Sequence, residues 1–411
     1  MVLEHVQAGT SGRGAGKRVL LIAYHYPPEA SAGAQRMGFI ARYLKDAGYE
    51  VSVVSPPPRR TQEGATAARA VSPLEARLRR FAGSVVHFPD RAVGWVPHAV
   101  SAALRETAKA HFDIVITSAM PASVHLTGWI VAHARGLPWI ADYRDLWTGN
   151  PYLEDGPLRR ALGATLERLL LGRANAITTV STPIAHSLAV LHRREHVDVI
   201  ANAVEPAEWE DVPFVTPDRF RIVHTGTLYE GKRKPDLLFG ALAHLRTQGH
   251  PLADEVCVDF YGHDNGAIDA IAREHGVADL VAYRGSIPRE SALREQRSAA
   301  LLLILLNMDP ATAGEYGSKL FEYAGARRPI LAIGPQASVV RSYLEAHRMG
   351  AFASDEEQTR LALIAAYDRY RAGEAALRLA FDPTAFFTAR DLALRFQDVI
   401  DRIVQPRGFF H

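Results

Sequence analysis

The chain has 411 residues, of which 48% are hydrophobic and 22% charged, and its formal net charge is +2. These values exclude a fibrous or disordered chain, and the small net charge gives no general attraction to nucleic acid. Because one hydrophobic core seldom serves more than about 250–300 residues, we expect two domains of roughly 200 residues each.

The first 17 residues are rich in Gly and Ser and contain no long apolar core. We therefore expect a loose tail and not a signal peptide. The longest aliphatic run, residues 299–306, is too short to cross a bilayer. The single cysteine, Cys257, cannot form an internal disulfide, which indicates a reducing compartment. These features favour a cytoplasmic protein.

Basic residues gather between Arg59 and Arg80, where six arginines stand among only two acids, Glu63 and Glu75. Such a cluster suits the anionic lipid head groups at the inner face of a membrane, so the sequence indicates a peripheral membrane contact there. The alternative is a solvated loop and helix, because runs of like charge usually face water.

Short apolar runs alternate with longer amphipathic stretches along the whole chain. In the first half, the runs predict strands at residues 19–23, 51–54, 114–117, 139–141, 176–180 and 197–200. Helical patterns, such as residues 36–47 and 121–134, separate them. This alternation predicts an α/β domain with a parallel sheet covered on both faces.

The pattern restarts after an acidic, proline-containing passage at residues 204–213, which looks like a linker. The next apolar runs predict strands at residues 221–224, 256–261, 281–284, 301–306 and 330–333. A long amphipathic helix closes the chain and needs an apolar surface to cover. We therefore predict a tail at 1–17, doubly wound domains at 18–205 and 206–385, and a helix at 386–411 that crosses back to the first domain.

Parallel sheets bind ligands outside the carboxyl ends of their strands, so two such domains facing each other would enclose a central cleft. The segment from Tyr316 to Tyr323 predicts a loop and a helix opened by Ser318, whose free N–H groups suit an anion. Lys319 and Glu322 share one helix face. Either they form a surface ion pair, or Lys319 reaches phosphates while Glu322 accepts the hydroxyls of a ribose.

The second domain opens with a strand, a turn at Gly226 and Thr227, and three successive cations at residues 232–234. Fixed cations beside a glycine turn match a diphosphate leaving group, and a solvated basic loop is the alternative. Because the predicted helix start at Ser318 belongs to the same domain, we assign Arg233 to phosphate contact.

Polar or small residues also follow strands of the first domain. Gly33 stands at a helix start, where a substrate can approach backbone amides, although a plain turn explains it equally well. His125 lies in the first turns of a helix and either reaches a ligand hydroxyl or is a buried, satisfied histidine. The loop from Asp142 to Trp147 is dense in charge, and its polar side chains either orient an acceptor or lock the loop by ion pairing. We assign Asp142 and Arg144 to the acceptor.

From about Arg18 onward the chain resembles a family-4 retaining glycosyltransferase of GT-B fold, which has two facing Rossmann-like domains and holds the donor nucleotide mainly in the second. Four blocks carry the resemblance: residues 27–36, residues 118–125 with 142–147, residues 224–229 with Arg233, and residues 318–323.

The resemblance implies a role for each matching position. His125 would contact the transferred sugar, and Arg233 with Lys319 would neutralise the diphosphate, which makes these three the predicted catalytic residues. Glu322 matches the ribose-binding second acid of a Glu-x7-Glu motif. The acceptor side would include Arg36, Asp142 and Arg144. The implied donor-binding residues are Gly33, Gly226, Thr227, Arg233, Ile287, Glu315, Tyr316, Gly317, Ser318, Lys319, Leu320 and Glu322.

Two positions depart from the family pattern. Gly314 stands where the first acid of the Glu-x7-Glu motif is expected, and Glu315 is one residue out of register, so the acid that binds the donor sugar is absent or displaced. Thr227 replaces the arginine of a Gly-Arg turn, which leaves Arg233, with Lys232 or Lys234, to carry the phosphate charge.

The expected activity is transfer of a hexosyl group, with a UDP-sugar favoured as donor, to an acceptor hydroxyl with retention at the anomeric carbon. The acceptor would be a small molecule, a lipid-linked molecule or a glycan, in glycan, glycolipid or natural-product biosynthesis. The sequence has no Asp-x-Asp motif, so we expect no metal cofactor. A sugar-nucleotide epimerase or hydrolase on the same fold, and a non-catalytic sugar-nucleotide-binding protein, are the alternatives.

Overall fold

The computed structural model describes residues 2–6, 16–29, 31–57, 87–153, 156–228, 232–263, 266–373, 377–379 and 387–404. The predicted lipid contact between Arg59 and Arg80 lies outside these residues. The chain divides into two compact units, one made of residues 1–201 with 389–411 and the other of residues 202–388. Within the described ranges, no helix combines the length and the apolar character that a membrane span needs.

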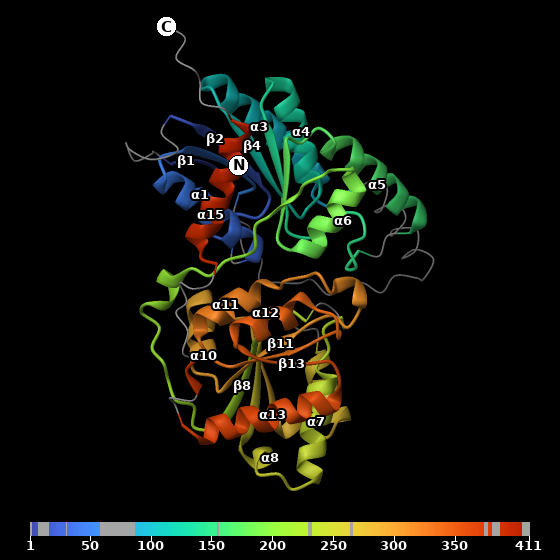
Figure 1. The fold of residues 1–411 in the computed structure, drawn as a ribbon, viewed down its shortest axis with the longest axis vertical. Helices are drawn as coiled ribbons and strands as arrows, with labels where there is room; N and C mark the ends of the chain where they lie inside the picture. The colour runs from blue at the N-terminus through green and yellow to red at the C-terminus, as the bar shows by residue number, and fades with distance from the viewer. Residues whose placement is uncertain are drawn as a thin grey trace, which may run out of the picture. The chain divides into compact units, whose positions relative to one another are not determined.

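The first unit is built on a seven-stranded sheet in the order β1-β3-β2-β4-β5-β6-β7 (Figure 1). All neighbouring strands are parallel except β1 and β3. The strands are β1 (Val2–Val6), β2 (Arg18–Ala23), β3 (Glu50–Ser55), β4 (Ile114–Ala119), β5 (Trp139–Tyr143), β6 (Ala176–Thr179) and β7 (Asp198–Val199). The prediction of a loose tail is wrong for Val2–Val6, since these residues pair with β3 along the sheet edge.

Six helices and one 3-10 turn complete the described part of the first unit. They are α1 (Ala32–Asp46), η1 (Val93–Trp95), α3 (Val96–Lys109), α4 (Ser123–Arg135), α5 (Pro157–Leu171), α6 (Thr182–His192) and α15 (Ala389–Ile403). The closing helix α15 lies beside α1 in Figure 1 and contacts it. Its buried residues include Leu392, Phe396 and Ile400, which form the apolar face seen in the sequence. The crossing helix therefore belongs to the first unit.

The second unit is built on a six-stranded, fully parallel sheet in the order β10-β9-β8-β11-β12-β13. The strands are β8 (Phe220–Thr225), β9 (Val256–Tyr261), β10 (Val281–Gly285), β11 (Leu301–Leu305), β12 (Ile330–Ile333) and β13 (Gly350–Ala353). The first five match predicted strands. The short edge strand β13 was not predicted.

The helices of the second unit cover this sheet. They are η2 (Pro206–Trp209), α7 (Asp236–Thr247), α8 (Leu252–Glu255), α9 (Ala267–Glu274), η3 (Ala278–Leu280), α10 (Arg289–Arg297), η4 (Pro310–Thr312), α11 (Ser318–Ala326), α12 (Val339–His347) and α13 (Glu356–Arg371). Leu238, Phe239 and Leu242 of α7 pack into a core with Phe220 and Phe260 of the strands. The continuous apolar strands fit a sheet buried on both faces.

The passage at residues 204–213, which we predicted as a linker, follows the boundary between the two units and packs within the second unit. Trp209 is only 4% exposed. It lies against Gly325 of α11, where an added Cβ would come within 2.0 Å of the indole Nε1. The Arg297 guanidinium stacks over the same indole, 5.0 Å from its centroid. The tryptophan therefore fixes the start of the second unit to its own helices.

Candidate functional site

Two glycines bring adjacent loops together at the carboxyl edge of the second sheet. Gly226 follows β8 with φ of 153°, a conformation that favours glycine. Its N–H donates to the Tyr261 carbonyl over 2.8 Å. A Cβ on Gly262, which follows β9, would lie 2.2 Å from the Gly226 carbonyl oxygen. Gly226 is favoured by its backbone conformation, whereas Gly262 is needed because the two turns touch.

Helix α11 starts at the same edge with open space before it. The helix begins at Ser318, as predicted, and Gly317 is its N-cap residue. No side chain caps this helix start. A Cβ on Gly317 would meet no atom within 4 Å. N–H groups without a side-chain cap at a helix start suit an anion.

The structure brings Gly226, Lys319 and Glu322 together. The Lys319 Nζ lies 2.7 Å from the Glu322 Oε1, and the two side chains are 31% and 8% exposed. The Lys319 Cε would lie 3.7 Å from a Cβ on Gly226. The predicted cation, acid and glycine turn therefore form one cluster, although they come from segments far apart in the sequence.

Glu322 is held as a carboxylate by three neighbours. Arg289 Nη1 donates to Oε2 over 2.8 Å, and Gln296 Nε2 and Lys319 both donate to Oε1. Burial opposes the charge, but the cations Lys319 and Arg289 outweigh it and lower the pKa of Glu322 to about 2. A carboxylate offers about four acceptor positions, so these three bonds leave capacity for a further donor.

Sequence reasoning missed Arg289 and Gln296. Arg289 also donates from Nε to Glu208 Oε1 over 3.0 Å, and Gln296 Nε2 donates to Thr225 Oγ1 over 2.9 Å. The two residues lie seven apart on α10, a spacing that places both on one helix face. That spacing was the available signal, but it gains meaning only once α10 is known to pack beside α11.

His224 is a third residue that sequence reasoning missed. Its Nδ1 lies 2.9 Å from the Leu303 carbonyl oxygen, which only accepts, so Nδ1 carries the proton. Its Nε2 is a buried acceptor without a hydrogen-bond partner and would lie 3.5 Å from a Cβ on Gly226. Burial is the main cause that lowers the pKa of His224 to about 4, and the Lys319 and Arg233 charges add to it. His224 is therefore a neutral acceptor beside the turn.

The other predicted donor residues have varied settings. Thr227 is exposed, Ile287 is half-buried after β10, and Leu320 is buried within the unit. The Arg233 N–H donates to the Leu228 carbonyl over 3.2 Å. The ring of Tyr316 packs edge-on against Phe321 and Tyr343, and the Glu315 N–H donates to the Thr312 carbonyl. The Leu320 side chain belongs to the packing of α11 and does not line the open space.

The predicted acceptor residues Arg36 and Asp142 form an internal pair in the first unit. They are 2% and 0% exposed. Arg36 binds both oxygens of Asp142, over 3.1 and 2.9 Å, and Ser118 and Thr178 each donate to the same carboxylate over 2.8 Å. Arg36 also donates to the Ile200 and Ala201 carbonyls. The prediction that Arg36 and Asp142 touch an acceptor is therefore wrong, because their hydrogen-bonding capacity is used inside the fold.

Gly33 and Arg144 meet each other. A Cβ on Gly33 would lie 2.0 Å from Arg144 Nη1, so the guanidinium occupies the space that the glycine leaves. The same guanidinium donates to the Ala119 and Met120 carbonyls over 2.9 and 2.6 Å. Gly33 was expected to let a substrate approach, but in the structure it is the Arg144 side chain that approaches.

His125 lies in the first turn of α4 and is fully buried. Its Nδ1 lies 2.8 Å from the Thr117 hydroxyl oxygen, which also accepts from Trp139 Nε1. The other ring nitrogen, Nε2, is buried and has no hydrogen-bond partner. Burial lowers the pKa of His125 to about 3, so the ring is neutral and enclosed, and a sugar cannot reach it in this conformation.

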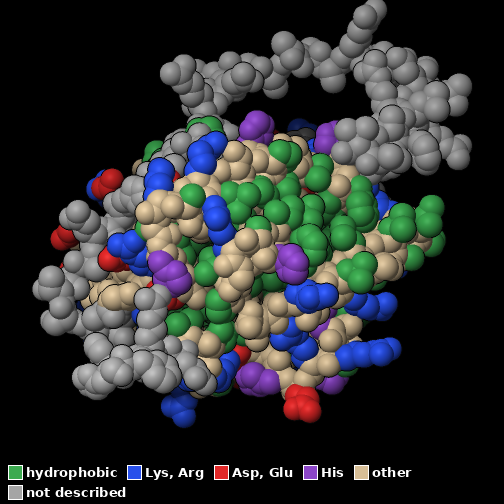
Figure 2. Space-filling view, turned by 90° about the horizontal axis from the view of Figure 1, so that it is seen from above, with side chains coloured by type: hydrophobic (Ala, Val, Ile, Leu, Met, Phe, Trp, Pro, Cys, Tyr) green, Lys and Arg blue, Asp and Glu red, His purple; other side chains and the backbone are tan. Residues whose placement is uncertain are grey.

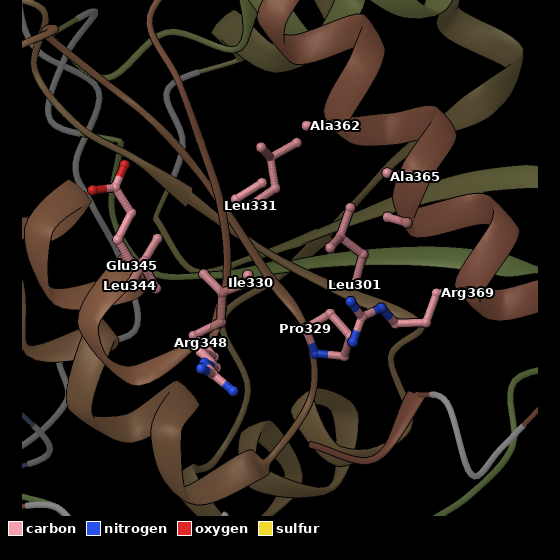
Figure 3. Close-up of a pocket in the computed structure, with 13 residues that line it drawn as sticks. Leu301, Pro329, Ile330, Leu331, Leu344, Glu345, Arg348, Ala362, Ala365 and Arg369 are labelled. Atoms are coloured by element: carbon pink, nitrogen blue, oxygen red, sulfur yellow. The ribbon is translucent and has the colours of Figure 1, made fainter. Parts of the chain in front are cut away.

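A pocket of about 370 Å³ lies at the other edge of the second sheet (Figure 3). Leu301, Ile330 and Gly350 line it, and they are the first residues of β11, β12 and β13. Arg348 and Arg369 also line it. Since ligands of parallel sheets bind at the carboxyl ends, this pocket is separate from the cluster around Glu322. Among the residues with described positions, no three His, Cys, Asp or Glu side chains gather as metal ligands.

Comparison with solved structures shows the fold. A sucrose-phosphate synthase from Thermosynechococcus elongatus is similar over 94% of this chain and 99% of its own, with 16% identity and a TM-score of 0.67. The HepE protein of Anabaena, solved in complex with UDP-glucose, is similar over 94% and 99%, with 13% identity and a TM-score of 0.61. WaaG, a glycosyltransferase involved in lipopolysaccharide biosynthesis, is similar over 94% and 100%, with 16% identity and a TM-score of 0.56.

These likenesses and the two parallel sheets define a GT-B fold with two Rossmann-like units, as the resemblance predicted. Residues 34–208 match the family described as Glycosyltransferase Family 4. A search of curated proteins gave no match. This match and the similar solved structures of glycosyltransferases support a glycosyltransferase of this family, as the resemblance predicted.

Proposed function

We propose that the enzyme moves a hexosyl group from a nucleoside diphosphate sugar, with UDP-sugars favoured, to an acceptor hydroxyl with retention at the anomeric carbon. The observation that carries the proposal is the Lys319–Glu322 pair, at 2.7 Å, beside the Gly226 turn at the carboxyl edge of the second sheet. HepE, of similar fold, was solved with UDP-glucose, which supports the same class of donor.

Each part of the cluster suits one part of such a donor. The ionised Glu322 accepts hydrogen bonds from ribose hydroxyls, for which it retains acceptor capacity. The uncapped start of α11 and the Lys319 ammonium meet the diphosphate. Arg233, whose charge acts on the neighbouring His224, adds positive charge near the same turn. In this proposal the neutral His224 Nε2 accepts one hydrogen bond from the donor.

We propose that the leaving group itself assists the attack and that this gives retention. The cations stabilise the negative charge that grows on the leaving diphosphate. A phosphate oxygen of the leaving group takes the proton of the incoming hydroxyl on the same face of the sugar, so the new glycosidic bond keeps the anomeric configuration. We expect no divalent metal to be needed, because Lys319 and Arg233 supply the charge. Activity that persists in the presence of EDTA checks this.

Calorimetric titration with UDP, GDP, ADP and dTDP tests the site. Glu322→Gln should weaken binding of the preferred nucleotide about tenfold to a hundredfold, because a charged acceptor is worth about 1.5–3 kcal/mol. Glu357→Gln is the matched control, because Glu357 also pairs with a cation three residues away, Arg360, but on an exposed helix surface. Unchanged affinity in Glu322→Gln would contradict the proposed site.

Turnover separates transfer from the two alternatives. UDP-glucose is incubated with maltose or octyl glucoside as trial acceptors, and release of UDP is measured. Release that depends on the acceptor supports transfer. Equal release in water alone indicates a hydrolase, and tight binding without any release indicates a silent binding protein.

A further inference from the structure

A pocket of about 370 Å³ lies in the second unit, where α12 and α13 meet the first residues of β11, β12 and β13 (Figure 3). Side chains such as Leu301 and Ile330 are buried behind its wall. The accessible apolar wall consists of small residues, which are Gly350, Ala351, Ala362, Ala365 and Ala366. We call this cavity the α12–α13 pocket. Its volume falls within the range of pockets that hold small organic molecules.

The room in the α12–α13 pocket comes from the sequence of α13. Four residues of this helix line the pocket from one face, because they follow the helical repeat, and they are Ala362, Ala365, Ala366 and Arg369. The short alanine side chains leave space in front of the sheet, and the face ends in a guanidinium. Leu363, on another face of α13, is buried in the core and holds the helix to the sheet. The alanine face is therefore not needed to anchor α13.

Two arginines of the pocket keep their charges available. Arg348 ends α12 and Arg369 lies in the last turn of α13, and both are exposed. Neither guanidinium forms a hydrogen bond or an ion pair with another residue of the described ranges. The one acid among the residues that line the pocket, Glu345, pairs instead with Arg341 over 3.0 Å. In Figure 3 the Arg369 guanidinium turns toward Pro329, whereas the Glu345 carboxylate points to the opposite side. Figure 2, by contrast, is a view onto another part of the surface, where hydrophobic and basic side chains are mixed.

We propose that the α12–α13 pocket binds a small amphipathic anion, whose oxyanion head contacts Arg348 and Arg369 and whose compact apolar body lies against the alanines. A guanidinium donates two parallel hydrogen bonds to a carboxylate or a phosphate. Apart from these arginines and Glu345, no residue that lines the pocket has a polar side chain, so the wall suits an apolar body and not a sugar or a base. A cationic ligand would be repelled by the two arginines.

The pocket is separate from the proposed nucleotide site. It lies at the amino ends of the strands of the second sheet, whereas the cluster around Glu322 lies at their carboxyl ends. A ligand can therefore occupy the pocket while a nucleotide is bound at the other edge of the same sheet.

The test is calorimetric titration of the full-length enzyme with naphthyl phosphate and with naphthoate. Two further probes separate the parts of these ligands, because naphthylmethanol has the apolar body without a charge and inorganic phosphate has the head alone. At least one naphthyl anion should bind about tenfold more tightly than either of these, since it uses both the arginines and the apolar wall. The tighter of the two naphthyl anions identifies the head group that the pocket prefers.

Two kinds of variant test the two parts of the pocket. Arg348 has φ of 53°, a left-handed conformation that asparagine tolerates, so Arg348→Asn removes the charge without adding backbone strain. Arg348→Asn and Arg369→Gln should each weaken binding of the naphthyl anion about threefold to tenfold, and together at least about tenfold. Ala365→Leu fills the space and should weaken it at least about tenfold, whatever the head group.

Matched controls lie on α9 of the same unit. Arg273 is an exposed arginine and Ala270 an exposed alanine, and neither lines the pocket. Arg273→Gln and Ala270→Leu should bind the naphthyl anion as wild type does. Lys319→Met should also bind it as wild type does, because Lys319 belongs to the other edge of the sheet.

Three results would overturn the proposal. The first is that neither naphthyl anion binds more tightly than naphthylmethanol and inorganic phosphate. The second is wild-type affinity in both Arg348→Asn/Arg369→Gln and Ala365→Leu. The third is loss of binding in Lys319→Met alone, which would place the probe in the nucleotide site. Titration with UDP should give the same affinity for wild type and the pocket variants, so a failure here is distinct from a failure of the proposed function.

Discussion

Each unit holds a cation–carboxylate pair near the carboxyl ends of its strands, but the two pairs differ in the hydrogen-bonding capacity that they leave unused. Arg36 and Asp142 of the first unit are almost fully buried, and the carboxylate accepts four hydrogen bonds from its own chain. Lys319 of the second unit is 31% exposed, and Glu322 accepts three. The first pair is saturated by the fold, whereas the second keeps capacity for a ligand.

His125 of the first unit and His224 of the second unit also differ in the hydrogen-bonding capacity that a ligand could use. Both are neutral and buried, and each has an Nε2 without a partner. In His125 this atom is enclosed within the first unit, whereas in His224 it is an acceptor beside the Gly226 turn. Charged or polar residues after a strand therefore indicate a binding site only where hydrogen-bonding capacity remains unused next to open space.

The largest expected effect is that of Arg36→Met. It leaves Asp142 buried without its cation, which should cost about 3–5 kcal/mol of unfolding free energy. The change also removes the guanidinium over the Phe396 ring of α15. Urea unfolding measures the loss. Arg36→Met/Asp142→Leu should recover most of it, because an apolar pair of similar volume replaces a buried ion pair. A loss below about 1 kcal/mol would show that the pair is not structural.

Gly33→Ala should destabilise the first unit by about 1–3 kcal/mol, because Arg144 must move and weaken its bonds to the Ala119 and Met120 carbonyls. Thermal unfolding measures the change. Gly317→Ala is the contrasting substitution, since its Cβ meets no atom within 4 Å, and it should shift stability by less than about 0.5–1 kcal/mol. Equal effects at the two glycines would contradict the packing described here.

Acid should destabilise both units through their buried histidines. The pKa of each is depressed from 6.5, to about 3 for His125 and about 4 for His224, so the unfolded chain binds more protons below pH 6.5. Stability should therefore fall by about 1.4 kcal/mol per pH unit and per histidine as pH drops from 6.5 toward those values. Urea unfolding at a series of pH values measures the slope.

Substitution assigns that slope to each histidine. His125→Gln should remove the contribution of His125 to the slope between pH 6.5 and about 3. His224→Gln should remove the contribution of His224 between pH 6.5 and about 4. If neither variant changes the slope, the two imidazoles are not the buried neutral groups that the structure shows.

Lys319→Met should have the smallest effect on stability, below about 1 kcal/mol, because its partly exposed ion pair contributes little to folding. Its effect should appear in nucleotide affinity instead, measured by titration with UDP. This outcome is the reverse of that expected for Arg36→Met. If Lys319→Met lowered the free energy of unfolding by more than this and still bound UDP with wild-type affinity, the contrast between the two pairs would be wrong.

Most of the fold was predictable from the sequence because parallel strands buried on both faces give continuous apolar runs. Eleven predicted runs correspond to β2–β12. The strand β13, with the sequence Gly-Ala-Phe-Ala, is too short and too small in its side chains to give that signal. The strand β1 was missed because a Gly- and Ser-rich stretch follows it. Its strand character depends on pairing with β3, which a local pattern does not reveal.

The candidate site was predictable only in part. Gly226, Lys319 and Glu322 come together as expected, because motifs that follow parallel strands meet at one edge of the sheet. The pairing of Arg289 with Glu322 and the hydrogen-bonding state of His224 depend on contacts between distant segments. The sequence likewise did not show that Asp142 is saturated, since Ser118 and Thr178 lie on different strands.

The return of α15 to the first unit bears on the order in which the chain folds during synthesis. Residues 202–388 form a continuous unit whose sequence is complete before α15 is synthesised. The first unit lacks the partner of α1 until that moment, and its Arg36 has no Phe396 ring beside it. Although nascent chains usually complete their N-terminal domain first, here the second unit is complete in sequence before the first.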